Sequence, residues 1–198
     1  MADNRRKGKK ARGRPVAPVP PTVRSVPIVP VINGWTLLPH HLLLGQLANL
    51  VAAATKERAV AGAPPGPNTK LLANVNAIMF DEVPTAPGDP MYRHGGAIAG
   101  GHREWYRAKT GNGRFRLFYR FDSRTMIIIY AWLNDDDTLR TYGSRTDAYA
   151  VFARMLDDGN PPGTWDELLA AARVDATTPL ARALFTPPPA FPPPKPPT

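Results

Sequence analysis

A cluster of basic residues lies between positions 103 and 124 of this 198-residue sequence. The window holds seven arginine and lysine residues against two acidic residues, which gives a net charge of +5. Residues 31–172 contain 14 basic and 14 acidic residues in total, so the window differs from a neutral background. Its basic members are Arg103, Arg107, Lys109, Arg114, Arg116, Arg120 and Arg124. Arginine offers a bidentate fork of N–H donors, so the cluster is suited to binding phosphate.

The cluster falls on two segments of strand length, 102–110 and 114–122. Side chains alternate between the two faces of a strand, so one face of this pair is predicted to be core and the other to face outward. The outward face would carry Trp105, Arg107, Lys109, Arg114, Arg116, Phe118 and Arg120. Like charges side by side destabilise a sheet unless an anion lies between them, and an aromatic neighbour can stack on a base. The pattern therefore predicts an RNA-binding face with Arg103 at its edge; the alternative is a solvated face paired with the acidic run 135–137.

The same residue types indicate a reaction. RNA carries its own nucleophile, the 2′-OH, so its cleavage needs a base, an acid and positive charge, but no metal ion or other cofactor. A basic site thus favours RNA over DNA as the substrate. Histidine is a common general acid or base, so His102 is a candidate for proton transfer, although a histidine near a sheet edge is often structural. The run 135–137 could bind Mg²⁺, but consecutive carboxylates diverge, and a turn-and-cap role is favoured. His40 and His41 are expected to be ordinary surface residues.

The elements that must position these side chains follow from the hydrophobic pattern. Three segments joined by short turns predict an antiparallel meander over 102–110, 114–122 and 125–133, and residues 91–97 could add an edge strand. Apolar residues at helical spacing predict two helices before the meander and two after it. Their expected starts are Pro39, Asn68 or Thr69, Thr146 and Thr164. This order of elements predicts an α+β domain.

Proline marks the ends of this domain. Of the 24 prolines, 14 lie in 15–30 and 187–197, and residues 1–24 carry a net charge of +7. Such segments cannot bury enough apolar surface to fold, so residues 1–30 and 176–198 are predicted to be disordered tails around one domain, 31–175. The absence of cysteine excludes disulfides and thiolate sites. No apolar run approaches the roughly 20 residues of a membrane span, so a cytoplasmic protein without a membrane partner is expected.

Seven segments of the sequence match a known pattern. They are INGW (32–35), TKLL (69–72), YRHG (92–95), WYRAK (105–109), RFRLFYR (114–120), WLNDDDTLRTYGSRTDAYAVFARML (132–156) and NPPGTWDELL (160–169). On these segments the chain resembles the YhaV family of type II toxins, a branch of the RelE-like ribonuclease superfamily. The resemblance covers residues 32–173, and the long block from 132 is highly specific. The implied fold is a RelE-like small twisted antiparallel sheet packed against helices.

The resemblance also implies a function and partners. The chain is expected, from this resemblance, to be a toxin that cleaves mRNA, free or on the ribosome, and so inhibits translation and growth. A cognate antitoxin of the PrlF type, with an AbrB-like domain, would hold the toxin inactive. Operator DNA would be bound only through the toxin–antitoxin complex.

Site residues can be carried over from the resemblance. Two basic residues spaced two apart on the central strand match Arg107 and Lys109, and an arginine of the next strand matches Arg116. We expect Arg107 and Arg116 to bind the scissile phosphate and stabilise its transition state. Lys109 or His102 would assist proton transfer from the 2′-OH.

A C-terminal arginine and tyrosine of the pattern match Arg140 and Tyr142 or, less well, Tyr149. An insertion at 134–137 precedes these positions in this chain. Arg140 and Tyr142 would help the leaving group or orient a base. Two other functions stay open: a binding module that keeps the fold without cleaving RNA and represses its own promoter with its antitoxin, and an interaction protein whose working parts are the tails.

Overall fold

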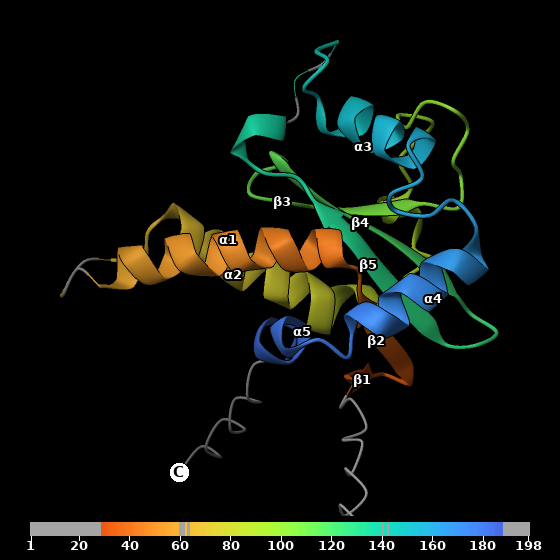
Figure 1. The fold of residues 1–198 in the computed structure, drawn as a ribbon. Helices are drawn as coiled ribbons and strands as arrows, with labels where there is room; N and C mark the ends of the chain where they lie inside the picture. Colours follow the sequence, from red (N-terminus) through yellow and green to blue (C-terminus); the bar gives the residue numbers. More distant parts are fainter. Residues whose placement is uncertain (1–28, 60–61, 63, 140, 142, 188–198) are drawn as a thin grey trace, which may run out of the picture.

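The computed structural model describes residues 29–59, 62, 64–139, 141 and 143–187. A five-stranded sheet forms the middle layer, in the order β1-β2-β5-β4-β3 (Figure 1). Helices cover both faces of the sheet, and each face has its own apolar core. The α+β class predicted from the sequence is confirmed.

The predicted meander forms half of the sheet. It consists of β3 (Tyr106–Thr110), β4 (Phe115–Asp122) and β5 (Ile127–Leu133), and each strand is antiparallel to the next. The turn between β3 and β4 has three consecutive residues with positive φ, at Gly111, Asn112 and Gly113. Glycine and asparagine tolerate this left-handed backbone, which explains why the turn lies there.

Two further strands make the sheet mixed rather than antiparallel throughout, which corrects the expected arrangement. β1 (Val31–Ile32) and β2 (Trp35–Pro39) form a hairpin through Asn33 and Gly34, with φ values of 50° and 82°. β2 then pairs with β5 in parallel. Periodicity could not reveal β2, because both faces of this strand are largely buried and its apolar residues do not alternate with polar ones.

The first helical pair covers one face of the sheet. It consists of α1 (His41–Arg58) and α2 (Pro67–Ala77), and α2 continues into the π-helical turn η1 (Ile78–Glu82) and the 3₁₀ turn η2 (Val83–Thr85). Both helices were predicted, but the cap of α2 differs from the prediction. The N-cap residue is Gly66, and the amides of Asn68 and Thr69 donate to the Glu57 carboxylate of α1 at 3.0 and 2.8 Å.

The folded part of the chain extends beyond the expected boundary at residue 175. Helix α5 (Pro179–Leu184) lies beside α1 on the same face of the sheet (Figure 1). Phe185, which follows α5 and is 4% exposed, packs its ring near those of Phe80 and Tyr130. The remaining predicted tail residues, 1–28 and 188–198, lie outside the described residues. Among the described residues, no helix combines the length and hydropathy needed to cross a membrane.

The second helical pair covers the face that was expected to point outward. α3 (Ala148–Asp157) and α4 (Trp165–Asp175) are both confirmed, with side-chain caps from Asp147 and Thr164. Because these helices fold back over the sheet, this face carries a second core instead of a solvated surface. Residues 91–97 add no strand; the 3₁₀ turn η3 (Pro90–Tyr92) lies there, and η4 (Asp136–Thr138) follows β5.

Candidate active site

Arg107 and Arg116 lie on neighbouring strands, under helix α3. In the β3–β4 ladder Lys109 is opposite Arg116, and Phe118 is opposite Arg107, so the two arginines are diagonal neighbours. Arg107 is 9% exposed and Arg116 is 5% exposed. The prediction that these basic side chains are cross-strand neighbours is confirmed. The prediction that both arginines face solvent is wrong, because the side chains lie beneath α3.

Tyr149, in the first turn of α3, contacts both guanidinium groups. Arg107 Nε donates a hydrogen bond to the Tyr149 hydroxyl at 3.0 Å. The guanidinium carbon of Arg116 lies 5.4 Å from the centre of the tyrosine ring, within the range of a cation–π interaction. The Asp147 carboxylate accepts from the Tyr149 amide at 3.0 Å and so fixes this turn of the helix. Arg107, Arg116 and Tyr149 therefore form one group of side chains, the arginine–tyrosine cluster.

Carbonyl oxygens are the other partners of the two guanidinium groups. Arg107 Nη1 donates to the Met91 carbonyl and Arg116 Nη1 to the Gly113 carbonyl, each at 2.6 Å. Arg116 Nε is buried without a hydrogen-bond partner. No carboxylate forms an ion pair with either arginine within the described part of the chain. Burying a charge without its counter-charge is unfavourable by several kcal/mol, so the cluster is electrostatically suited to an anion.

Asn134 fixes the backbone beside Arg116. Its side-chain oxygen accepts from the Arg116 amide at 2.5 Å, and its Nδ2 donates to the Thr138 carbonyl at 3.0 Å. The acidic run that follows has the predicted capping role: Asp135 Oδ1 accepts from the amide and the hydroxyl of Thr138. Asp135 Oδ2 accepts from Gln46 Nε2 at 3.2 Å. This carboxylate therefore ties α1 to η4 and leaves the arginines without an acidic partner.

A cavity of about 490 Å³ opens beside Tyr149. It lies between the segment that contains Ala97 and Ala99 and the beginning of α3. Arg145 and Arg154 also form part of its wall. The cavity gives an anionic ligand a positively charged approach to the tyrosine side of the cluster.

Other predicted site residues lie around the cluster rather than in it. Arg103, Lys109 and Arg114 are exposed. His102 is partly exposed, with Nδ1 3.5 Å from a carboxylate oxygen of Glu104, and no described contact joins it to the arginine–tyrosine cluster. Arg140 and Tyr142 lie outside the described residues.

Trp105 and Phe118 do not offer a surface to a base. Both side chains are fully buried, and both pack on the Phe152 ring of α3, at centroid distances of 5.0 and 4.2 Å. This corrects the expectation that they stack on RNA, because the sequence alone did not show that α3 covers them.

Arg120, also predicted to bind RNA, has a packing role. Its guanidinium carbon lies 5.5 Å from the Trp105 ring and 5.7 Å from the Trp165 ring, and Nη1 donates to the Gly163 carbonyl at 2.8 Å. Burial lowers the pKa of the Arg120 guanidinium, and the charge of Glu104 opposes this shift. Arg120 therefore joins β4 to the segment that leads into α4.

A histidine and carboxylate group lies elsewhere, where α1 begins and α4 ends. One donor atom from each of His40, His41 and Asp175 lies within 4.8 Å of the others, a grouping that could hold a metal ion. Asp175 Oδ2, however, already accepts from the His41 amide at 2.8 Å, which is the geometry of a helix cap. His40 is fully buried, which corrects its expected place on the surface, and burial together with the charge of His41 lowers its pKa to about 4.

Two residues beside the arginines, Tyr149 and Asn134, had little or no signal in the sequence. Tyr149 shares the apolar face of its helix with Phe152, so its spacing indicates core packing. Tyr149 was only the weaker match to the tyrosine of the family pattern. No other feature of the sequence pointed to a functional role for this residue. Asn134 gave no signal, because one carboxamide after a strand is typical of any turn.

Comparison with known proteins places this chain in a class of toxins. Residues 37–173 match the model of a family described as a toxin with endonuclease activity, of a toxin–antitoxin system. The chain belongs to this family, the YhaV toxins, as the sequence motifs indicated. Membership of the family implies an antitoxin partner.

Individual relatives agree with this family. Toxin YhaV of Escherichia coli O6:H1 is 40% identical over 143 residues, which cover 69% of this chain and 91% of that protein. A protein of Escherichia coli strain K12 named Ribonuclease toxin YhaV is 39% identical over 143 residues, with the same coverage. The comparison with solved structures gave no match.

Proposed function

We propose that this chain is a ribonuclease toxin and that the arginine–tyrosine cluster is its catalytic centre. One observation carries the proposal: two buried guanidinium groups, which have no carboxylate partner among the described residues, meet at one tyrosine. A phosphodiester supplies the missing negative charge, and its transition state carries more charge than its ground state. The K12 relative, whose name includes ribonuclease, supports RNA as the substrate.

The proposed reaction is an in-line transfer within RNA. The 2′-oxygen attacks the adjacent phosphorus while the bond from phosphorus to the 5′-oxygen breaks, which gives a 2′,3′-cyclic phosphate and a 5′-hydroxyl. Arg107 and Arg116 bind the non-bridging oxygens and stabilise the charge that develops there. Lys109, exposed opposite Arg116, or His102 assists removal of the 2′ proton.

Tyr149 is the proposed acid. Its hydroxyl oxygen accepts from Arg107 Nε, and a phenolic hydroxyl can donate its proton to the departing 5′-oxygen. The positive charge of Arg107 beside this oxygen also stabilises the phenolate that remains. We therefore assign to Tyr149 the leaving-group role that the family pattern gave to Arg140 and Tyr142.

We also propose that the reaction needs no metal ion or cofactor, since the two arginines provide the positive charge. The substrate is mRNA in the cytoplasm, free or on the ribosome, and its cleavage inhibits translation and growth. The proposed antitoxin is of the PrlF type with an AbrB-like domain, and operator DNA is bound through the toxin–antitoxin complex. Acidic side chains of the antitoxin would contact the exposed Arg103, Lys109 and Arg114. Salt should therefore weaken the toxin–antitoxin complex.

The test uses purified full-length protein and single-stranded RNA in the presence of EDTA. We expect Arg107→Ala and Arg116→Ala each to slow cleavage by about 100-fold or more and to abolish growth arrest in cells. Arg124→Ala is the matched control, because that side chain is 91% exposed and lies in the β4–β5 turn. Parent-like cleavage and toxicity of Arg107→Ala would overturn the assignment. A parent protein that binds RNA but does not cleave it with or without metal would identify a binding module.

A further inference from the structure

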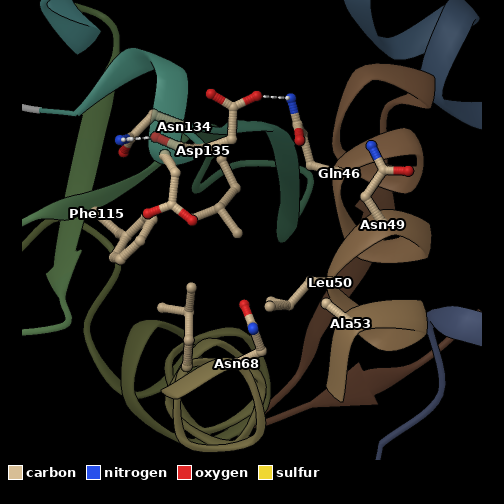
Figure 2. A pocket seen from close by; sticks show the side chains of 11 residues that line it. Gln46, Asn49, Leu50, Ala53, Asn68, Phe115, Asn134 and Asp135 are labelled. Carbon is tan, nitrogen blue, oxygen red and sulfur yellow. Dashed lines mark hydrogen bonds between the residues drawn. The ribbon is translucent and has the colours of Figure 1, made fainter. Parts of the chain in front are cut away.

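A groove lies on the opposite face of the sheet from the arginine–tyrosine cluster, where α1 and α2 meet the β3–β4 turn. Two adjoining cavities of about 170 and 530 Å³ form it, and both are lined by Asn68, Leu71, Phe115 and Asp136. Figure 2 shows the smaller cavity, with Asn49 and Leu50 projecting from α1 and Phe115 facing them across the space. We call the two cavities together the α1–α2 groove.

The lining of the groove combines an apolar floor with unused polar groups. The floor contains Leu50, Leu71, Phe115 and Leu133. Several polar side chains in the wall make no side-chain hydrogen bond or ion pair within the part of the chain that the structure describes: Asn49, Lys70, Asn74, Asn112, Arg114 and Asp136. Three of these side chains are neutral carboxamides and three are charged, and the charges are of both signs.

This combination favours a nucleobase over other occupants. In the smaller cavity a bare phosphate would be repelled, because the charged residues of its lining are Asp135 and Asp136, and a purely apolar ligand would leave the carboxamides of that lining without partners. A base has an apolar face for Leu71 and Phe115 and an edge of donors and acceptors for the carboxamides. A closed cavity of roughly 150 Å³ accommodates benzene, so the smaller cavity has room for an aromatic ring.

The groove adjoins the cluster through the β3–β4 turn. Gly113 accepts from Arg116 Nη1, whereas its neighbours Asn112 and Arg114 line the groove. Asn134 also belongs to both places, because it lines the groove and its side chain accepts from the Arg116 amide. An RNA strand with a phosphate at the cluster can therefore pass over this turn and place a neighbouring base in the groove.

We propose that the α1–α2 groove is a specificity subsite that binds an unpaired guanine next to the cleaved bond, an inference that rests on the proposed function. The Asp136 carboxylate accepts from the N1–H and the exocyclic N–H of guanine, an adjacent donor pair that uracil and adenine lack. Leu71 and Phe115 lie against the ring. Lys70 and Arg114 bind the flanking phosphate.

The first experiment separates base binding from catalysis, because guanosine has no phosphate. We expect guanosine to bind to the full-length protein about tenfold more tightly than uridine in calorimetric or NMR titrations, and Arg107→Ala to bind it equally well. Asp136→Asn should weaken guanosine binding by about tenfold. Asp137→Asn is the matched control, since it is the next residue of η4, is exposed and does not line the groove. Equal guanosine binding by these two variants would overturn the subsite.

The second experiment maps cleavage sites in a pool of RNAs by sequencing the new ends. The parent and Asp137→Asn should prefer guanine at one position beside the cleaved bond, and Asp136→Asn should cleave without this preference. RNA cleavage without guanosine binding overturns the subsite and leaves the proposed function standing. Guanosine binding without any RNA cleavage would support the subsite and overturn the proposed ribonuclease activity.

Discussion

The Tyr149 hydroxyl lies 3.0 Å from Arg107 Nε, and this hydrogen bond joins residues 42 positions apart in the sequence. Tyr149→Phe removes the hydroxyl but keeps the ring that packs edge-on against Phe118 at 5.7 Å. We expect RNA cleavage to slow by about 100-fold, the usual contribution of a general acid. The free energy of unfolding should fall by only about 1 kcal/mol. Cleavage rates and urea denaturation measure the two effects.

Tyr130→Phe is the control for this variant. The Tyr130 hydroxyl donates to the Met79 carbonyl in the other core, so its loss should reduce stability by a similar amount of about 1 kcal/mol without slowing cleavage. If both variants cleaved RNA as fast as the parent, Tyr149 would have no part in the chemistry.

Arg116→Met replaces a buried charge with an apolar side chain of similar length. In the described part of the chain no carboxylate pairs with Arg116 and its Nε has no hydrogen-bond partner. We therefore expect the free energy of unfolding to stay the same or rise by about 1 kcal/mol while cleavage is lost. Inorganic phosphate should raise the Tm of the parent and leave that of the variant unchanged. A Tm lowered by more than about 5 °C would instead identify the guanidinium as a structural support.

Glu57 makes the stability of the fold depend on pH in the acidic range. Desolvation alone would raise the pKa of its carboxyl, but hydrogen bonds from Asn68 and Thr69 outweigh desolvation and lower the pKa to about 2. A depressed folded-state pKa means that the carboxylate stabilises the fold fully above its ordinary value of 4.5, and that this contribution is lost as the pH falls from 4.5 towards 2. A Cβ at Gly66 would lie 2.5 Å from the Glu57 carboxyl carbon, so a side chain there would displace the carboxylate from its present position.

Glu57→Gln tests this assignment. We expect the variant to be less stable than the parent at pH 7 and the difference to shrink as the pH is lowered through the same window, measured as urea midpoints at several pH values. The exposed Glu82→Gln is the control. A difference that did not change with pH would show that the hydrogen bonds do not depend on the carboxylate charge.

The residues after 175 contribute to stability, in contrast to the tail predicted from the sequence. Phe185→Ala removes a buried ring that lies 5.3 Å from Phe80, so we expect a loss of about 3 kcal/mol in the free energy of unfolding. Leu180→Ala on the same helix is the control, because Leu180 is 42% exposed and should contribute less than about 1 kcal/mol. Chemical denaturation measures the stability of both variants. Equal losses of stability would show that the Phe185 ring is not the main anchor of this segment.

Local signals in the sequence predicted local structure well. The turn at Gly111 to Gly113 and the helix cap at Thr164 lie where expected, because turn and cap chemistry depends on neighbouring residues. The pairing of β2 with β5 could not be predicted, since it depends on residues far apart in the sequence. The same limit affected the site: alternation placed Arg107 beside Arg116, but only tertiary structure brings α3 and Tyr149 over them.

The parallel pairing of β2 with β5 also sets the point in synthesis at which the sheet can form. Thr36 lies opposite Ile127, so the sheet cannot close during synthesis until the chain has grown past β5. Pairing across such a long stretch of chain slows folding, because the entropy of closing the loop is lost before the contacts form. The cluster additionally needs Tyr149, which follows β5. A newly synthesised chain therefore passes through an interval in which the proposed catalytic centre has not yet formed.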